Sequence, residues 1–524
     1  MRSTFMGLEA SKRGLFTQQS ALYTTGHNIS NANTEGYSRQ RVNMQPTLPY
    51  PGVGLNNDTN AGYIGTGVEA GSVQRIRDSF IDKQYRQEAT KLGYWEARSQ
   101  SITEMEDILT EPSDYGLAQS LNDFYNSLQD LNVNPEDGGA RAVVVQRGIA
   151  VADSFHYMHN SIQQIKENAA SEIGILLRDA NSILEQIAGI NAQIQAVEPN
   201  GYLPNDLYDA RDNLIDKLST YFPVETTKVQ SGGNALANAE GSLTVSLKLN
   251  GVQSITLVEG KNFAKLSNRG TNTETPTGMV TGLGGVDSSG DSINADINIF
   301  NSLGKFKSLV DSYGYKSNVT TPASEKGLFP DMLKKLDTLA KEFADAFNSI
   351  HKKGTDLKGV TGKEFFVSND TSSPITGGNI YVSQTILNDA SLIAASDSLE
   401  TTPIPTPEPG NGKNALALAN IKFKNLNDQN GGGNLGGVSV QTYFEGLIGQ
   451  LGVDGQQAER LKYNSETLKQ AVTEKRASVS SVSLDEEMTN MITFQQAYNA
   501  NARMISVIDE TLDKIINGMG RVGL

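Results

Sequence analysis

Apolar side chains recur every seven positions at the amino terminus, and this spacing constrains the fold more than any other feature of the chain. The repeat comprises Met1, Leu8, Leu15, Leu22 and Ile29, and Phe5 lies between the first two members. A stripe near the carboxyl terminus comprises Met488, Met491, Tyr498, Ile505, Ile508, Leu512, Ile515 and Met519. A seven-residue spacing is buried only against a partner helix. Two stripes at opposite ends therefore predict one coiled coil built from both termini.

Helical spacing continues well beyond the first helix, which is expected over about residues 3–31. The Pro- and Gly-rich stretch 46–67 predicts an extended linker. From about residue 72 to 218 the apolar positions follow a helical period. The clearest run is Ile173, Leu176, Ala180, Ile183, Ile187, Ile190, Ile194 and Val197, and Glu198-Pro199-Asn200-Gly201 should end it. The periodicity predicts a bundle of long helices.

The pattern changes to alternation near residue 224. Asn250-Gly251 follows an alternating segment, which is typical of a β-hairpin. A three-residue loop over 250–252 would pair Leu247 with Ile255 and keep the apolar face intact. The same loop would pair Val245 with Leu257. Residues 224–300 are therefore expected to be β-rich, and a second, less regular β stretch is expected over 355–400. The alternating apolar residues are Leu243, Val245, Leu247 and Leu249.

Helical spacing returns between the two β stretches and again near the carboxyl terminus, so the elements are nested. This order predicts a mostly α fold with inserted β modules: a terminal helical coiled coil, a helical-bundle rod and β-rich distal modules. A chain of 524 residues is long enough for about three domains. The expected domains are 1–67 plus 473–524 for the terminal coiled coil and linker, 68–223 plus 301–354 plus 413–472 for the rod, and 224–300 plus 355–412 for the β-rich part.

Charge and composition argue against several classes of protein. The chain has 44 basic and 59 acidic residues, a net charge of −15, which disfavours a nucleic-acid binder. Cysteine is absent, so no disulfide, thiolate nucleophile or Cys-ligated metal is available. No stretch of 18 apolar residues is present, and Lys12 and Arg13 interrupt the apolar segment that a secretory signal peptide needs. If the protein is extracellular, we expect export without cleavage of its amino terminus.

No constellation of residues predicts catalysis, a metal site or a cofactor. His156 and His159 are three residues apart, but a zinc site would need a third ligand at suitable spacing. Gly65-Thr66-Gly67 lacks the third glycine and the preceding strand of a dinucleotide loop. Asp206, Asp209, Asp212 and Asp216 recur at helical spacing, which does not match a calcium loop. We interpret these four aspartates as the acidic, solvated face of an amphipathic helix, and we expect no enzymatic activity.

Several motifs resemble those of bacterial flagellar axial proteins. The amino-terminal signature is Asn31-Ala32-Asn33-Thr34 with Gly36-Tyr37-Ser38-Arg39-Gln40, and the carboxyl-terminal one is Ser483-Leu484-Asp485-Glu486-Glu487-Met488 with Gln495-Gln496-Ala497-Tyr498. Rod, hook and junction proteins share these ends. Two internal stretches are similar to the hook-associated protein 1 family of hook–filament junction proteins. They are Phe124-Tyr125-Asn126-Ser127-Leu128-Gln129 and Leu203-Pro204-Asn205-Asp206-Leu207-Tyr208-Asp209-Ala210-Arg211-Asp212.

The resemblance implies a structural, non-enzymatic role in the flagellum. Copies of the chain would assemble into a tubular layer at the distal end of the hook, after export through the flagellar type III apparatus. Implied partners are hook protein, a second hook-associated junction protein and a cytoplasmic chaperone at the carboxyl-terminal helix. The expected assembly interface is Phe5, Leu8, Leu15, Leu22, Ile29, Asn31, Asn33, Gly36, Tyr37, Leu484, Met488, Met491, Tyr498, Ile505, Ile508, Leu512 and Ile515.

Three alternatives remain open at the level of sequence. The terminal stripes are also compatible with the core of a self-contained bundle. Hook or distal rod proteins share the same ends, although two long helical insertions around a β module are not expected in them. A flagellar protein with an enzymatic variable domain belongs to a different class, and the absence of metal and nucleophile motifs disfavours it.

Overall fold

The computed structural model describes residues 5–49, 65–109, 116–250, 253–269, 273–299, 304–316, 325–370, 373–398, 408–426 and 435–518. The α-helices are α1 (Phe5–Ser30), α2 (Ser79–Leu109), α3 (Leu117–Val133), α4 (Gly138–Val197), α5 (Asn205–Tyr221), α6 (Lys305–Tyr313), α7 (Leu328–His351), α8 (Gln384–Asn388), α9 (Lys413–Ala419), α10 (Val440–Ser480) and α11 (Leu484–Gly518). Most of the expected linker, and the repeat members Met1 and Met519, lie outside the described residues.

The strands form small antiparallel sheets inserted between the helices. They are β1 (Gln40–Pro46), β2 (Val68–Arg75), β3 (Val224–Val229), β4 (Ser242–Asn250), β5 (Gln253–Glu259), β6 (Asn262–Phe263), β7 (Lys265–Asn268), β8 (Gly282–Val286), β9 (Ser292–Asp296), β10 (Tyr315–Lys316), β11 (Glu325–Lys326), β12 (Phe366–Ser368) and β13 (Ile380–Val382). The larger sheets have the orders β3-β4-β5-β6 and β7-β8-β9. The fold is mostly α with inserted β modules, which confirms the predicted class.

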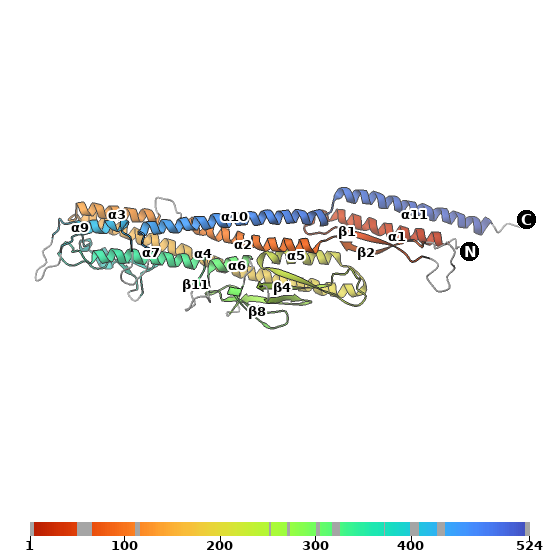
Figure 1. Ribbon diagram of the computed structural model, residues 1–524, viewed down its shortest axis with the longest axis horizontal. Helices are drawn as coiled ribbons and strands as arrows, with labels where there is room; N and C mark the ends of the chain where they lie inside the picture. Colours follow the sequence, from red (N-terminus) through yellow and green to blue (C-terminus); the bar gives the residue numbers. More distant parts are fainter. Residues whose placement is uncertain are drawn as a thin grey trace, which may run out of the picture.

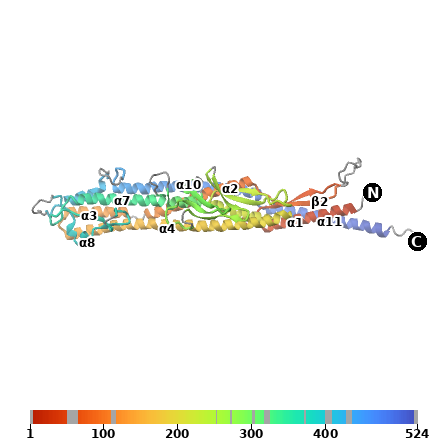
Figure 2. The same ribbon diagram turned by 90° about the horizontal axis from the view of Figure 1, so that it is seen from below.

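The molecule is a long, narrow rod with both termini at the same end (Figure 1). Helices α1 and α11 form that end, α2, α4 and α10 extend along the middle, and α3, α7 and α9 form the opposite end. A view turned by 90° is equally narrow (Figure 2). None of the described helices has an apolar stretch long enough to span a bilayer.

Helix α4 is the longest element of the rod. It has 60 residues, which at about 1.5 Å per residue gives a length of about 90 Å. Its first turn is capped by Asp137, whose carboxylate accepts a hydrogen bond from the backbone N–H of Gly139 at 2.8 Å. It ends at Val197, where a short 3-10 turn leads to Gly201 at a φ of 85°. The sequence analysis predicted this end correctly, because proline cannot continue the helix and glycine tolerates a left-handed backbone.

Two asparagines of α4 attach the sheets to the middle of the rod. The side chain of Asn191 donates to the carbonyl of Leu243 at 2.9 Å and accepts from its N–H at 3.2 Å. Asn181 makes the same pair of bonds with Leu266, at 2.9 and 2.7 Å. Each amide thus satisfies a buried backbone donor and acceptor that would otherwise be costly. The 224–296 strands are therefore fixed to α4 rather than projecting from it.

This attachment corrects the expected position of the first β module. The nested order placed residues 224–300 at the far end of the rod, whereas β4 and β8 lie beside its middle (Figure 1). The far end instead carries residues 355–398, including β12 and β13. Sequence order alone misplaced the module because α4 is long enough to return the chain most of the way to the terminal end before the strands begin.

The hairpin register was correct at one position and wrong at the next. Leu247 pairs with Ile255 as predicted, but Val245 pairs with Val258 rather than Leu257. A β-bulge between Val245 and Ser246 shifts the register by one residue. Asn250 pairs with Gln253, so the connection is shorter than the expected three residues.

The segment after the linker also differs from expectation. Residues 68–75 form β2, which pairs with β1 in an antiparallel ribbon against α1, and α2 begins only at Ser79. At the other end, α10 continues to Ser480 before α11 begins at Leu484. The structure therefore places the joint between the terminal elements and the rod near residues 76 and 481, rather than near 67 and 473.

Close packing of α2 against α5 depends on Gly93. A methyl group there would lie 2.4 Å from the carbonyl oxygen of Thr220, whereas one at exposed Gly189 of α4 would meet nothing within 4 Å. We expect Gly93→Ala to lower the free energy of unfolding by about 1–3 kcal/mol through overpacking. We expect Gly189→Ala to raise it by about 0.5–1 kcal/mol, because alanine favours helix. Guanidinium unfolding followed by the fluorescence of Trp95, the single tryptophan, measures both. Equal effects of the two substitutions would contradict the close contact.

Candidate functional site

The two termini form an antiparallel helical pair. A methyl group on Gly7 would lie 3.4 Å from Ile508, and one on Gly14 would lie 2.9 Å from Asn501. Further along, the side chain of Asn28 donates to the carboxylate of Glu487 at 3.1 Å. Residue numbers rise along α1 while those of their partners fall along α11, as expected for antiparallel helices, and the three contacts define the register of the pair.

The buried face of α1 is made of small and polar residues, not of the apolar repeat. It consists of Gly14, Thr17, Ala21, Thr24, Thr25 and Asn28. The repeat members Leu8, Leu15, Leu22 and Ile29 are half-buried, and Phe5 is exposed. The β1–β2 ribbon also packs on α1, and Thr17 donates to the carbonyl of Val68 at 3.1 Å. Small side chains are needed because helix and ribbon both approach α1 closely.

The predicted stripe of α11 divides between two faces. Met491, Tyr498, Ile505, Ile508 and Leu512 are half-buried, whereas Leu484, Met488 and Ile515 are exposed. Glu487 is buried, with 2% of its surface exposed, while the rest of the described side chains of α11 keep at least part of their surface in solvent. The pair alone therefore covers only part of the apolar surface of this helix.

Large apolar side chains that the sequence analysis did not select lie on the outer surface. On α1 they are Phe16 and Tyr23, and Tyr23 is 79% exposed. Phe5, Phe16 and Tyr23 are spaced by 11 and 7 residues, so at about 100° per residue they lie within about 20° of one line. This spacing was visible in the sequence. On α11 the additional exposed residues are Ile492, Met504, Val507 and Ile516.

The amino-terminal signature forms a polar turn around the side chain of Asn28. Asn28 donates to the carbonyl of Gln40 at 2.8 Å and accepts from its N–H at 3.0 Å. The Tyr37 hydroxyl donates to Asn28 at 2.8 Å, and it also lies 2.9 Å from Nδ1 of His27. Burial, followed by the carboxylates of Asp206, Asp209 and Glu487, raises the pKa of Tyr37 well above its usual value, so the hydroxyl stays protonated. The turn thus returns the chain from α1 to the ribbon.

The other signature residues in the turn have distinct places. Gly36 has a φ of 77°, and any side chain there would collide with Asn213 of α5. Asn31 donates to the carbonyl of His27 at 3.0 Å, which satisfies the end of α1. Asn33 is exposed. Gly36 and Tyr37 therefore contribute to the geometry of the turn rather than to an outer surface.

Arg39 joins the two signatures. Its guanidinium group contacts Glu487 at 2.7 Å and Glu486 at 2.6 Å. Its backbone N–H donates to the carbonyl of Ser480 at 2.9 Å. The amino-terminal motif therefore holds the short break between α10 and α11. Charge-assisted bonds of this kind are short and directional, so they orient α11 as well as attract it.

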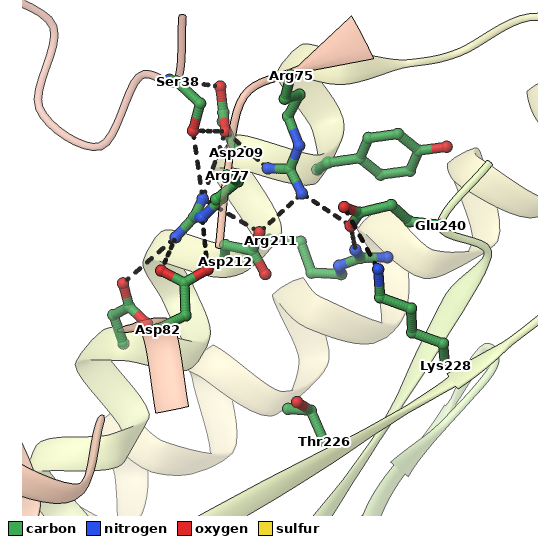
Figure 3. A network of polar contacts seen from close by, with 12 residues as sticks. Ser38, Arg75, Arg77, Asp82, Asp209, Arg211, Asp212, Thr226, Lys228 and Glu240 are labelled. Atoms are coloured by element: carbon green, nitrogen blue, oxygen red, sulfur yellow. Dashed lines mark hydrogen bonds and ion pairs between the residues drawn. The ribbon is translucent and has the colours of Figure 1, made fainter. Parts of the chain in front are cut away.

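A buried cluster of ion pairs joins this terminal unit to the rod (Figure 3). Arg75, at the end of β2, contacts Asp209 at 2.6 Å and Asp212 at 2.9 Å, both on α5. Ser38 donates to Asp209 from its N–H at 2.9 Å and from its hydroxyl at 2.7 Å. The same arginine contacts Glu240, just before β4, at 2.7 Å. These contacts link the signature turn, the ribbon, α5 and the sheet.

The cluster extends into α2 and α10. Arg77 contacts Asp82 at 2.8 Å, and Arg86 contacts Asp216 at 2.7 Å. Arg476, in the last turn of α10, contacts Asp82 and Asp216, each at 2.8 Å. The joint cluster, as we call it, comprises Arg75, Arg77, Arg86, Arg211, Arg476, Asp82, Asp209, Asp212, Asp216 and Glu240. Five cations thus face five anions.

The cluster corrects the interpretation of the four aspartates as a solvated acidic face. Asp209 and Asp212 are buried, Asp216 is largely enclosed, and only Asp206 is exposed. Burial alone would raise the pKa of Asp212, but Arg77, Arg75 and Arg86 outweigh it and hold that pKa well below its usual range. Burial raises the pKa of Asp82 and Asp216, where the arginines offset it only in part. Helical spacing could not reveal this burial, because Arg75, Arg77 and Arg86 lie more than 100 positions away from the aspartates that they contact.

Other candidate chemistry has a structural explanation. His156 packs against Tyr381, with ring centroids 4.6 Å apart, and burial lowers the pKa of His156. Among the described residues, no group of three or more His, Cys, Asp or Glu side chains is arranged to hold a metal ion.

Removing one carboxylate should weaken the joint strongly. Asp212→Asn leaves the buried Arg75, Arg77 and Arg86 short of one anion, and breaking a buried ion pair in this way costs about 3–5 kcal/mol of folding free energy. Asp107→Asn is the matched control, because Asp107 is exposed on α2 and should change stability by less than about 0.5 kcal/mol. Guanidinium unfolding of both variants measures the difference. Similar midpoints would show that Asp212 does not hold the joint.

The effect of Asp212 should depend on pH in a defined direction. A carboxylate whose pKa is lowered by folding contributes stability above its unfolded-state pKa of about 3.9 and loses it only as the pH falls through the lower folded-state value. The stability difference between the native chain and Asp212→Asn should therefore stay constant from about pH 7 to about pH 5 and shrink below about pH 4. Unfolding curves at several pH values measure this. A difference that already disappears near pH 6 would contradict the assignment.

Comparisons with known proteins agree with this arrangement. A family model described as "Flagellar hook-associated protein FlgK helical domain" matches residues 102–366. Models described as "Flagella basal body rod protein" and "Flagellar basal body rod FlgEFG protein C-terminal" match residues 8–37 and 475–518. The amino-terminal match covers most of α1 and ends two residues before Arg39, and the carboxyl-terminal match covers α11 and its signature.

Relatives match along almost the whole chain. "Flagellar hook-associated protein 1" of Escherichia coli (strain K12) is 26% identical, covering 96% of this chain and 98% of the relative. The structure of the flagellar hook junction protein FlgK from Burkholderia pseudomallei is similar at a TM-score of 0.58 and 14% identity, covering 76% of this chain and all of that one. "Flagellar hook-associated protein 1" of Bacillus subtilis (strain 168) is 42% identical and covers 99% of both chains. The chain therefore belongs to the flagellar hook-associated protein 1 family, structural components of the bacterial flagellum.

Proposed function

We propose that copies of this chain assemble through their terminal helices into a tubular layer that joins the flagellar hook to the filament. One observation carries the proposal: the terminal pair leaves large apolar side chains in solvent on both of its helices. They are Phe5, Phe16, Tyr23, Met488, Ile492, Met504 and Val507, each more than half exposed. Several large exposed apolar side chains on two neighbouring helices indicate an interaction surface.

The arrangement of the pair favours contacts between copies over a self-contained bundle. The outward aromatic line of α1 and the outer face of α11 belong to different helices, so one subunit presents two distinct apolar surfaces. When such surfaces meet in a head-to-tail manner, they generate rings or helical tubes rather than closed dimers. The expected interface residues Leu484, Met488 and Ile515 belong to the outer surface of α11, together with Met504 and Val507.

The proposed partners are those that membership of the hook-associated protein 1 family implies. Hook protein would contact the layer on one side and a second hook-associated protein on the other, and the filament would build on the latter. Before export, a cytoplasmic chaperone would cover the exposed apolar face of α11. The protein would reach the flagellum outside the cell without cleavage of its amino terminus. The relatives named hook-associated protein 1 match this chain over nearly their full length. This match favours the same role over that of hook or distal rod protein.

The division of labour along the chain is also part of the proposal. Helices α1 and α11 with the β1–β2 ribbon form the assembling unit, and the joint cluster sets its direction. The helices of residues 79–221, 305–351 and 413–480 form a stiff spacer. The sheets of residues 224–296 broaden the rod near the joint, and residues 355–398 close its far end.

A charge on the outer face of α11 should block assembly without unfolding the rod. Val507→Asp would bury a carboxylate in an apolar contact between copies, which costs several kcal/mol per contact. Ser506→Asp is the control, because it adds the same charge to an exposed polar position one residue away. Cells with Val507→Asp should export the protein but lack filaments, whereas those with Ser506→Asp should form them. Electron microscopy and far-UV circular dichroism measure both. Normal filaments with Val507→Asp would contradict an interface there.

The terminal pair should be the least stable part of a free subunit, because little apolar surface is buried within it. Trypsin should therefore cut after Arg503 and Lys514 of α11 well before it cuts after Arg178 of α4, which lies in the packed rod. Mass spectrometry of the early fragments gives the order of cleavage. Equal protection of the two regions would show that the pair is stable without neighbours.

A further inference from the structure

A cavity of about 830 Å³ lies beside the joint cluster, between α2 and the first sheet. The residues from α2 recur at helical spacing, so they form one face of the helix. The sheet region contributes the consecutive stretch 223–228, together with Leu243 and Lys248 of the neighbouring strand β4. Since strand side chains alternate between faces, a consecutive lining means that the edge of β3 borders the space. Strand β3 is terminal in its sheet, so its outer backbone groups have no strand partner among the described residues.

The side chains that line the cavity include more cations than anions, in a chain that is negative as a whole. Its lining holds seven cationic and four anionic side chains, an excess of three positive charges, whereas the chain carries a net charge of −15. The cations are Arg75, Arg77, Lys83, Arg86, Lys91, Lys228 and Lys248, and the anions are Asp82, Asp212, Glu225 and Glu240. A concave surface on which one sign of charge predominates attracts ions of the opposite sign.

The cations at the rim are available for exchange. Lys83 contacts Glu225 at 3.3 Å, and Lys228 contacts Glu240 at 3.6 Å, yet both lysine side chains are more than half exposed. Exposed single ion pairs of this type contribute little, so a ligand oxyanion can replace the carboxylate. Deeper in the site, Nε of Arg75 is buried and has no acceptor among the described residues. Figure 3 shows Arg75, Lys228 and Thr226 around this region.

We propose that the cavity binds a ligand with two or more neighbouring oxyanion groups. Lys83 and Lys228 would contact the outer group, Arg86 and Arg75 the inner one, and the edge of β3 would add backbone N–H donors. Pro223, Val224 and Leu243 supply an apolar wall for a short carbon body. The volume is within the range of about 300–1,000 Å³ that is usual for small-molecule sites. Such groups occur on a free multivalent anion and on adjacent acidic side chains of another polypeptide.

Occupancy of the site would act on the joint. Arg75, Arg77 and Arg86 line the cavity and also hold the carboxylates of α5. A ligand that binds only the folded arrangement stabilises it by mass action. The site would thus make the stiffness of the connection between terminal unit and rod depend on the anions around it. This inference does not rest on assembly, because binding is a property of the single subunit.

Calorimetry on the full-length monomer tests the proposal. Inorganic phosphate, citrate and a hexaglutamate peptide are titrated separately in a non-coordinating buffer, with sodium chloride adjusted to keep ionic strength constant, because screening alone changes with salt. We expect saturable one-to-one binding of at least one probe and a higher melting temperature of the complex. Citrate binding tighter than the peptide would indicate a free anion as the ligand. The reverse would indicate acidic side chains of another chain.

Matched variants locate the site. The double variant Lys83→Gln/Lys228→Gln should weaken binding roughly tenfold, by loss of two exposed charge contacts. Gln87→Glu, which adds a negative charge to the lining without changing side-chain size, should weaken it as well. Lys413→Gln, at an exposed lysine on α9 outside the cavity lining, should bind as the native chain does. Absence of saturable binding by all three probes, or equal affinity of the native chain and every variant, would overturn the proposal.

Discussion

The arrangement of the protein depends on the buried ion pairs of the joint cluster. Arginines from the ribbon, α2, α5 and α10 meet carboxylates from α2, α5 and the segment before β4. Buried ion pairs contribute little net stability, since desolvation offsets most of the attraction. They do require definite geometry, because each guanidinium group must meet its carboxylates at hydrogen-bonding distance. We interpret the cluster as a device that fixes the direction of the terminal unit relative to the rod.

The terminal pair solves a different physical problem. A subunit that must assemble cannot bury all its apolar surface within itself. Helix α1 therefore packs on α11 and on the ribbon through small residues such as Gly14 and Ala21, and it presents Phe16 and Tyr23 outward. Polar contacts of Asn28 and Arg39 with Glu487 hold the register, where apolar contacts alone would permit sliding. The rod, in contrast, has an extensive buried core, including the aromatic cluster in which the rings of Phe124 and Phe347 have centroids 5.2 Å apart.

The flagellar relatives explain why these two solutions are combined. Family models for rod proteins match the terminal helices, and the hook-associated helical-domain model matches most of the rod. The terminal helices thus resemble those of other flagellar proteins, whereas the rod resembles that of the hook-associated family. The joint cluster lies where the two parts meet, so it couples a general assembly element to a particular body. The cavity beside it, whose lining has more cations than anions, is the place where we propose that a ligand acts on this connection.

The sequence by itself determined the long helices, the end of α4 at the turn that leads to Gly201, the pairing of the termini and the family. These features depend on local periodicity, turn chemistry and motifs, which are written in adjacent residues. Only the tertiary structure decided which faces are buried. Asp209 and Asp212 follow the pattern of an exposed acidic face, yet Arg75 and Arg77, more than 100 positions earlier, neutralise them. The length of α4 likewise placed the sheets at the middle of the rod. Contacts between distant segments determine which side chains are buried, and the periodicity of one segment does not indicate which other segments will pack against it.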